Sequence, residues 1–274
     1  MRTIRVSCSP DADDLFMMRA LLENRIDTKG YTFEIDTIET NRLNQLAEGD
    51  GPEVSAMSIA WYPKLAAHYQ LLPHGGSMGE GYGPVVIAKE RLQLSELAGK
   101  RVAVPGLTTS AYAVLRWMVP FEPVVTPITP YSRIFEALRA GEVDAGLVIH
   151  EGRLTFEDEG FVKVADLGEW WAEEMDGLPL PLGGNAIRRD LGPTAIAEVS
   201  ALLRASIADA LKHRNEAIDW LIARGGALST RSRVDQYLGM YANQRTLDYG
   251  PAGRTAIERF LRKLGYEGDI DFAP

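Results

Sequence analysis

Residues 101–118 read RVAVPGLTTSAYAVLRWM, and this stretch decides the fold. It begins with a short apolar strand, Arg101–Val104, and continues into a segment with helical periodicity, Thr109–Met118. The same order repeats downstream, in a strand, a helix and a strand at Val124–Ile128, Tyr131–Ala140 and Ala145–Ile149. Short apolar strands that alternate with helices of about ten residues predict parallel pairing in a doubly wound α/β sheet.

A similar α/β segment precedes this stretch, and a helical segment follows it. We expect the upstream strands at Ile4–Ser7, Tyr31–Ile38, Val54–Ile59 and Val85–Ala88. We expect the upstream helices at Asp13–Asn24, Arg42–Glu48 and Trp61–Tyr69. Beyond Pro193 the expected helices are Thr194–Lys212, Asn215–Ala223, Arg231–Ala242 and Ala252–Leu264.

This order predicts two lobes that are joined by two crossings of the chain. Residues 1–88 and 186–274 would form one lobe, and residues 89–185 the other. Ligands of such sheets bind beyond the carboxyl ends of the strands. A cleft between the lobes is therefore the predicted ligand site.

Composition limits the classes of partner. The chain has 274 residues, of which 46% are hydrophobic and 24% charged, as in an ordinary globular protein. With 29 basic and 38 acidic residues its net charge is −9, and no Lys/Arg-rich run is present, so we expect no nucleic-acid partner. A small anionic ligand would have to be attracted by local dipoles and a few arginines.

The cysteine and histidine content bears on whether the protein binds a metal, and the amino-terminal sequence bears on its cellular compartment. Cys8 is the single cysteine, which excludes an intramolecular disulfide and a cysteine-based metal site. The four histidines lack metal-ligand spacing, so we predict neither a metal nor a cofactor. The start MRTIRVSCSP has no secretory pattern, and no apolar run approaches the ~18 to 20 residues of a membrane span. We therefore expect a cytoplasmic protein with no membrane partner.

Three consecutive hydroxyl residues open one expected helix. Thr108, Thr109 and Ser110 follow a strand and precede helical residues, so they lie at a helix end where backbone N–H groups are unpaired. Such an end can bind a carboxylate or a phosphate. The alternative is that one of the three is an ordinary N-cap without a ligand.

His150 follows directly on the strand Ala145–Ile149, at a carboxyl strand end. A neutral imidazole at pH 7 can accept a proton from a substrate, so this position suits a general base. The alternative is a histidine that makes only structural hydrogen bonds. Arg153, three residues later, is a candidate ligand for an anionic substrate.

Three further candidate substrate-binding residues lie in other loops. Asp14, after the first strand, could bind a substrate hydroxyl or cap its helix. Ser58 ends the strand Val54–Ile59. Gly76 lies in the glycine-dense stretch 75–84, which could turn sharply or allow a ligand to approach closely.

Several motifs together resemble the 1,4-dihydroxy-6-naphthoate synthase family of the futalosine route to menaquinone. These motifs are IHEGRLTF at 149–156, DLGEWW at 166–171, LPLPLGG at 178–184, the Gly79-x-Gly81-x-Gly83-Pro84 loop, the Ser9-Pro10 opening, and Pro105-Gly106 with its hydroxyl cluster and Ala111-Tyr112. The resemblance extends over nearly the whole chain.

The resemblance implies a two-lobed fold like that of type II periplasmic binding proteins. It also implies a lyase that cleaves cyclic dehypoxanthinyl futalosine, releases a three-carbon fragment and leaves the dihydroxynaphthoate. His150 matches the family's catalytic histidine, and Ser58, Thr109 and Ser110 match residues that bind the substrate carboxylate or hydroxyls. No cofactor is needed, because formation of an aromatic ring favours the carbon–carbon scission once a base has removed a proton.

Two departures from the family pattern keep alternatives open. The sequence reads Asp11-Ala12-Asp13-Asp14 where typical members have Cys-Pro-Asn-Asp, and His74 replaces a small hydroxyl residue. A carboxylate at Asp13 would repel an anionic substrate unless it faced away or was paired. The alternatives are a paralogue with another substrate and a solute-binding protein for a small carboxylate. The sequence makes no prediction of oligomeric state.

Overall fold

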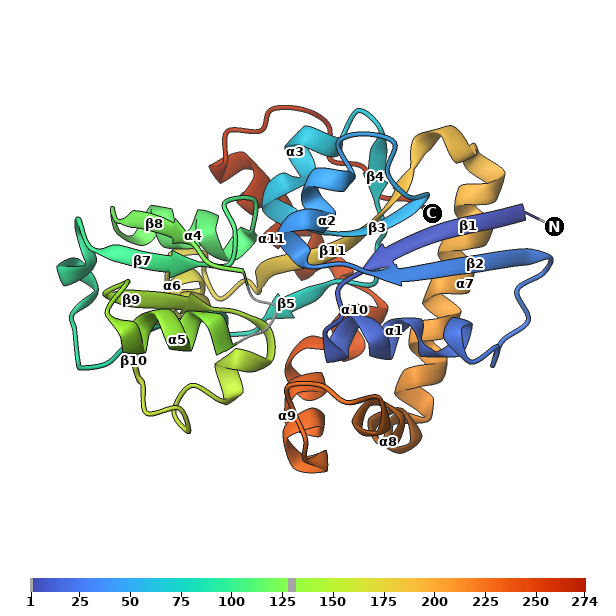
Figure 1. Ribbon diagram of the computed structural model, residues 1–274. Coiled ribbons are helices and arrows are strands. Elements are labelled where there is room, and N and C mark those ends of the chain that lie inside the picture. The colour runs from blue at the N-terminus through green and yellow to red at the C-terminus, as the bar shows by residue number, and fades with distance from the viewer. Residues whose placement is uncertain (1, 128–131) are drawn as a thin grey trace. The chain divides into compact units, whose positions relative to one another are not determined.

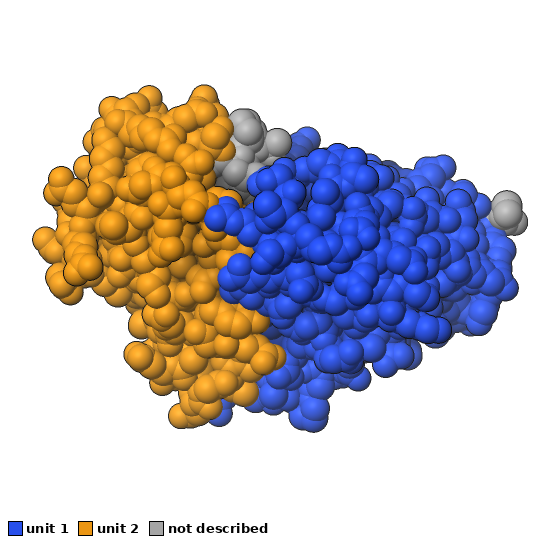
Figure 2. Space-filling model, turned by 90° about the horizontal axis from the view of Figure 1, so that it is seen from below, with its two compact units in different colours: residues 1–78, 181–274 blue, residues 79–180 orange. Residues whose placement is uncertain are grey.

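The computed structural model describes residues 2–127 and 132–274, which form two compact units. The first unit contains residues 1–78 and 181–274, and the second contains residues 79–180 (Figure 2). Both divisions come earlier than the predicted ones after residues 88 and 185. Val85–Ala88 belongs to the second unit because it is a strand of that unit's sheet. Residues 183–187 pair with Val54–Ser58 and so belong to the first unit.

The sheet of the first unit has the strand order β2-β1-β3-β11-β4 (Figure 1). Its strands are β1 (Arg2–Cys8), β2 (Tyr31–Thr37), β3 (Val54–Ser58), β4 (Tyr69–Leu71) and β11 (Leu180–Arg188), and β5 (Ser77–Gly79) also pairs with β11. β1 is parallel to β2 and β3, whereas β11 is antiparallel to β3 and β4. The carboxyl ends of β1 and β3 therefore lie at one edge of the sheet.

Helices cover both faces of this sheet, with α1 and α7 on one side and α2 and α3 on the other (Figure 1). The bounds are α1 Ala12–Leu22, α2 Thr40–Leu46, α3 Tyr62–Leu65, α7 Pro193–Lys212, α8 Arg214–Arg224, α9 Arg231–Tyr241, α10 Gln244–Leu247 and α11 Gly250–Lys263, with 3-10 turns η1 (Ile59–Trp61) and η4 (Arg189–Leu191). Buried side chains of β1 and β3 pack with those of α1 and α7. This shared apolar core fixes the helices on the sheet.

The prediction of one helix over Trp61–Tyr69 is wrong. Helix α3 ends at Leu65, and Tyr69 begins strand β4, which pairs with β11. The buried Tyr69 hydroxyl donates a hydrogen bond to the Pro52 carbonyl at 2.7 Å. Long-range pairing thus overrides the local helical periodicity.

The second unit has its own sheet, with the strand order β10-β6-β9-β7-β8. Its elements are β6 (Val85–Ala88), η2 (Leu94–Leu97), β7 (Arg101–Val104), α4 (Ser110–Met118), β8 (Glu122–Val125), α5 (Ser132–Ala140), β9 (Ala145–Val148), η3 (His150–Leu154), β10 (Val162–Asp166) and α6 (Leu167–Glu174). Of the predicted strand and helix ends in this unit, Ile128 and Tyr131 lie outside the described residues. β7 is parallel to β8 and to β9.

The parallel pairing predicted from the repeat at 101–149 is confirmed, since β7 is parallel to β8 and to β9. Each sheet also contains antiparallel pairs that the sequence did not predict. β6 is antiparallel to β9 and β10, and β11 is antiparallel to β3 and β4. β6 and β11 are the strands that follow the two crossings between the units. A strand that enters its sheet from the other unit does not need the helical crossover that keeps successive strands parallel.

Strand β8 forms one edge of the second sheet, and all four of its residues are exposed. The backbone N–H groups of Glu122 and Thr126 donate to β7 and its neighbouring residues, at 2.9 and 2.8 Å. The backbone groups of alternate residues in an extended chain point to opposite sides within the plane of the sheet. The backbone groups of Pro123, Val125 and Pro127 therefore point away from β7, toward the open edge. Val124 and Val125 are among the exposed apolar side chains, as is Leu107.

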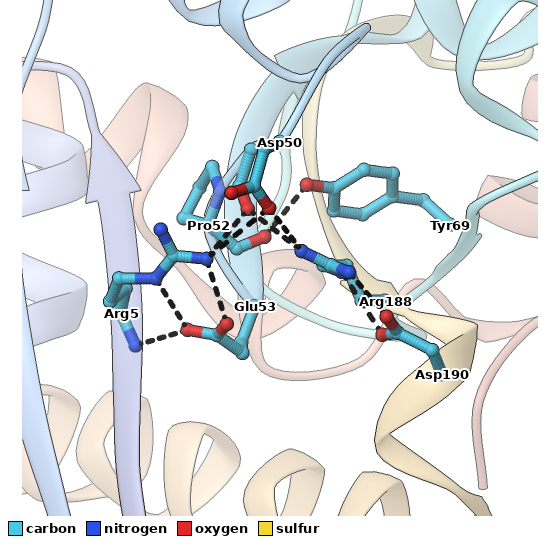
Figure 3. A network of polar contacts seen from close by, with 8 residues as sticks. Arg5, Asp50, Pro52, Glu53, Tyr69, Arg188 and Asp190 are labelled. Carbon is cyan, nitrogen blue, oxygen red and sulfur yellow. Dashed lines mark hydrogen bonds and ion pairs between the residues drawn. The ribbon is translucent and has the colours of Figure 1, made fainter.

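A network of charged residues joins the strands of the first unit (Figure 3). Arg5 of β1 donates to Glu53 through Nε at 3.1 Å, Nη2 at 2.9 Å and its backbone N–H at 2.8 Å. Arg188 of β11 pairs with Asp190, and its Nη1 lies 3.2 Å from Asp50. Glu53 directly precedes β3, so the network ties β1, β3 and β11 together at the end opposite Ser58.

We predict that Glu53→Gln destabilises the protein by about 1 kcal/mol at pH 7, since Arg5 and the glutamate are partly exposed. Burial alone would raise the pKa of Glu53, but the hydrogen bonds and charge of Arg5 together lower it. A lowered folded-state pKa gives stability that is present above the ordinary glutamate pKa and is lost as the pH falls through the folded value. The difference between wild type and variant should therefore shrink in acid.

Urea unfolding between pH 3 and pH 8 measures this effect, with the exposed Glu90→Gln as a matched control. The control should follow the wild type at every pH. A difference for Glu53→Gln that stays constant down to pH 3 would contradict the role given to the carboxylate charge.

Candidate active site

His150 occupies an unusual backbone position where β9 ends. All four residues of β9 are buried, Ile149 caps the 3-10 turn η3, and His150 is the first residue of that turn. Its φ of 52° lies in the left-handed region, which costs a non-glycine residue on the order of 1 kcal/mol. The imidazole is partly exposed. A strained residue that directly follows a buried strand is typical of functional sites.

The hydroxyl cluster and His150 leave the second sheet at the same edge. β7 and β9 pair in parallel, with Val102 opposite Ala145 and Ala103 opposite Gly146. The segment after β7 leads to α4, and the residue after Ile149 is His150. Because the carboxyl ends of parallel strands meet at one edge, the structure brings these two predicted parts of the site together within the second unit.

Thr109 is the N-cap of α4, as the alternative interpretation of the cluster proposed. Its Oγ1 accepts a hydrogen bond from the Tyr112 N–H at 3.2 Å and donates one to the Gly106 carbonyl at 3.0 Å. Thr109 and Ser110 are both buried. The cap leaves the first N–H groups of α4, including that of Ser110, outside the helical hydrogen-bond pattern.

Arg153 makes contacts inside the second unit. Its Nη1 donates to the Gly83 carbonyl at 2.6 Å and to Oδ2 of Asp166 at 2.7 Å. The Asp166 side chain is fully buried. Sequence reasoning missed Asp166, although an aspartate directly before a helix is a recognisable N-cap signal.

In the first unit, Ser58 lies at the end of β3 and is buried. Its Oγ accepts a hydrogen bond from Nδ2 of Asn44 at 3.0 Å, and its N–H donates to Oδ1 of the same amide at 2.9 Å. A hydroxyl that accepts one hydrogen bond can donate its proton to another acceptor. Ser58 is thus oriented by Asn44, a residue that sequence reasoning did not single out.

Asp14 organises the turn after β1. Its Oδ2 accepts a hydrogen bond from the Ser9 N–H at 2.6 Å, and the Ser9 hydroxyl donates to Asp11 at 2.6 Å. Asp14 is 9% exposed and lies in the first turn of α1. The Asp11 side chain at the N-cap of α1 makes no capping hydrogen bond, but a carboxylate in the first turn still interacts favourably with the helix dipole.

Asp13 accepts two hydrogen bonds from hydroxyl groups of distant segments. Ser77 of β5 donates to its Oδ2 at 2.6 Å, and Tyr237 of α9 donates to its Oδ1 at 3.1 Å. Asp13 and Tyr237 are both buried. The carboxylate that replaces the family's usual amide is therefore paired within the first unit.

Gly76 is enclosed by other residues of the first unit. A Cβ atom at Gly76 would lie 2.5 Å from the Tyr249 hydroxyl oxygen and 2.7 Å from the Gly183 carbonyl oxygen. At neighbouring Gly75 a Cβ would lie 2.4 Å from Nδ2 of Asn185. Close packing alone thus requires glycine at both positions.

His74 is buried, and its Nε2 lies 3.1 Å from the Ser200 hydroxyl oxygen. Ser200 in turn donates a hydrogen bond to the Pro274 carbonyl at 2.9 Å. Burial, reinforced by the charge of Arg204, lowers the pKa of His74 to about 4. The imidazole is therefore neutral in the folded protein near pH 7.

The described residues contain neither a cluster of metal ligands nor a membrane-spanning helix. Across residues 2–127 and 132–274, no three His, Cys, Asp or Glu side chains gather as a metal ion would require. In the same part of the chain, no helix combines the length and the apolar character needed to cross a membrane.

Comparison with known proteins gives a consistent family. Residues 4–266 match a family model described as menaquinone biosynthesis. A protein of Thermus thermophilus named 1,4-dihydroxy-6-naphthoate synthase is 38% identical over 270 residues, 98% of this chain and 96% of the relative. A protein of Streptomyces coelicolor with the same name is 34% identical, over 97% of this chain and 94% of the relative.

Solved structures agree with these matches. A crystal structure of an Archaeoglobus fulgidus protein has a TM-score of 0.87 and 40% identity, over 96% of this chain and 98% of the other. The alkanesulfonate-binding protein of Xanthomonas axonopodis has a TM-score of 0.68 over 100% and 96% of the two chains at 13% identity, which concerns the fold alone. The predicted α/β fold of periplasmic-binding-protein type, with its helical C-terminal region, is confirmed, whereas the cleft stays a prediction.

We predict that His74 makes the protein sensitive to mild acid. Its pKa is lowered from an ordinary value of 6.5 to about 4, so protonation favours the unfolded chain. The stability that depends on neutral His74 is complete above pH 6.5 and falls by about 3 kcal/mol as the pH drops to 4. His74→Gln, whose amide nitrogen can replace Nε2, should remove this part of the pH dependence.

The free energy of unfolding from urea titrations at pH 4 to 7.5 measures the change. His68→Gln is the matched control, because His68 is exposed on the same unit. It should keep the wild-type pH dependence. A His74→Gln curve parallel to that of the wild type would be evidence against a buried neutral imidazole.

Proposed function

The chain belongs to the menaquinone biosynthesis family, and we propose that it is a 1,4-dihydroxy-6-naphthoate synthase with His150 as its general base. The enzyme is a carbon–carbon lyase, and its substrate is cyclic dehypoxanthinyl futalosine. Two relatives that match almost from end to end carry the synthase name. The solute-binding alternative has no such support, because the binding proteins of this fold are less than 20% identical to the chain.

The observation that carries the proposal is the shared edge of the second sheet. The parallel pairing of β7 and β9 puts the start of α4 and His150 at the same strand ends. A helix start can bind a carboxylate through backbone N–H groups that lie outside the helical hydrogen-bond pattern, and an imidazole can accept a proton. The two functions that the reaction needs therefore come from adjacent elements.

The binding roles follow from the hydrogen bonds of each residue. The Thr109 hydroxyl both donates and accepts a hydrogen bond within the protein, so Thr109 shapes the start of α4. We assign the binding of the substrate carboxylate to Ser110, the first residue of that helix. Ser58, held by Asn44, donates its proton to a substrate oxygen. Asp14 and Gly76 stabilise loops of the first unit through their contacts with Ser9 and Tyr249.

The proposed reaction requires that the substrate be held in a fixed position and that a proton be removed from it. His150 removes a proton from the substrate, the carbon–carbon bond breaks, and the three-carbon fragment leaves as the remaining ring system becomes aromatic. Fixed placement of the substrate relative to the imidazole lowers the entropic part of the barrier. A general base of this kind contributes about 10²- to 10⁴-fold to the rate.

The acidic departure at Asp13 does not argue against this substrate. Its two carboxylate oxygens accept hydrogen bonds from Ser77 and Tyr237, which hold the carboxylate against the first unit's own hydroxyl groups. This is the paired arrangement that an anionic substrate would tolerate. The paralogue alternative thereby loses its main support from the sequence.

We predict that the purified protein converts cyclic dehypoxanthinyl futalosine to 1,4-dihydroxy-6-naphthoate without an added cofactor. Product absorbance and mass measure the conversion. If the compound binds but no naphthoate forms, the protein is a paralogue or a binding protein, and the synthase proposal fails.

We predict that His150→Ala lowers kcat by about 10²- to 10⁴-fold while the substrate still binds. Calorimetric titration with substrate and steady-state kinetics separate binding from turnover. His68→Ala is the control, since His68 is an exposed histidine of the first unit and should leave kcat unchanged. Wild-type turnover by His150→Ala would remove the base assignment.

A further inference from the structure

The turn that carries His150 is attached to the rest of the second unit through Arg153. Both residues belong to η3, and the Arg153 side chain is 16% exposed. Its Nη1 donates to Asp166 at 2.7 Å and to the Gly83 carbonyl at 2.6 Å. A single nitrogen thus joins the turn to the start of α6, 13 residues later, and to a loop 70 residues earlier.

Both carboxylate oxygens of Asp166 accept hydrogen bonds. Oδ2 accepts the hydrogen bond from Arg153, while Oδ1 accepts from the N–H groups of Gly168 at 2.8 Å and Glu169 at 3.3 Å. Asp166 is therefore the N-cap of α6 as well as the partner of Arg153. Because its side chain is fully buried, its charge depends on the guanidinium for compensation.

The second anchor, Gly83, lies in a loop that is packed directly on α6. A Cβ atom at Gly83 would lie 2.7 Å from the Gly168 nitrogen, and one at Gly168 would lie 2.0 Å from the Tyr82 carbonyl. Neither position has room for a side chain. Arg153 is thus fixed to a junction of loop and helix that is close-packed at the backbone.

The turn itself is also tightly placed against β9. A Cβ atom at Gly152 would lie 2.5 Å from Cγ1 of Val148. His150, two residues earlier, has the left-handed φ of 52°. A strained backbone persists only when its surroundings hold it, and the contacts of Arg153 supply that support at the other end of the turn.

We propose that Arg153 is a positioning residue that acts through His150, rather than a ligand of the substrate as its sequence position suggested. Its attachment to Asp166 and Gly83 fixes η3 and thereby the place of the imidazole. This inference rests on the proposed function, in which His150 is the base.

Arg153→Met tests the two roles against each other. Loss of positioning should lower kcat by about 10²-fold with little change in KM, since a misplacement of about 1 Å is enough for such a loss. Loss of a substrate ligand would instead raise KM. Arg139→Met is the matched control, because Arg139 pairs with Glu159 on the surface of the same unit and should leave both constants unchanged.

Arg153→Lys provides the conservative variant. Because one nitrogen makes both contacts, an ammonium group at the same place can donate to Asp166 and Gly83 together. We expect Arg153→Lys to recover most of the kcat that Arg153→Met loses. If Arg153→Met does not fold, Arg153→Lys and Asp166→Asn decide the question, with thermal unfolding to confirm that each is folded.

Imidazole NMR separates this inference from the synthase proposal, because it needs no substrate. The His150 ring signals, assigned with His150→Ala, should shift or broaden in Arg153→Met while those of His68 and His213 stay in place. A protein without synthase activity that shows this shift would overturn the function and leave the positioning role intact. Unchanged His150 signals, or a raised KM with normal kcat, would overturn the positioning role.

Discussion

The ion pair between Arg153 and the fully buried Asp166 ties the second unit together at the carboxyl end of β9. It joins η3, which begins with His150, to the amino end of α6, and the same guanidinium nitrogen also binds the Gly83 carbonyl. Removing one partner of a buried pair leaves an uncompensated charge, at a cost of about 3–5 kcal/mol. The loop at Gly83, the turn η3 and the start of α6 therefore stabilise one another.

The polar residues around both sheets have two kinds of role. Some stabilise the fold through hydrogen bonds within the protein, and others are proposed to contact the substrate. Thr109 and Asp14 stabilise helix starts, and Asp13 joins α1 to β5 and α9. In our proposal the reacting groups are few, with His150 as the base and Ser110 and Ser58 as donors to the substrate. An active site of this kind depends on the rigidity of its frame more than on the number of its polar residues.

Local patterns in the sequence predicted most strands and helices, because periodicity and capping residues act over a few positions. Runs such as 149–156 and 166–171 also identified the family. The antiparallel direction of β6 was not predictable and β11 was not predicted as a strand, since both follow crossings between the units that leave no local signal. Nor were contacts such as that of Tyr237 with Asp13, which lies 224 residues away and has no local signal.

The open edge of β8 has a consequence for how the protein behaves at high concentration. An edge strand that contains exposed valines would ordinarily template the growth of intermolecular β-structure. Within the described stretch 122–127, two of the three outward-facing residues, Pro123 and Pro127, have no N–H group, which leaves Val125 as the outward backbone donor of this stretch. The prolines act as gatekeepers against aggregation, and the apolar valines can stay exposed beside them.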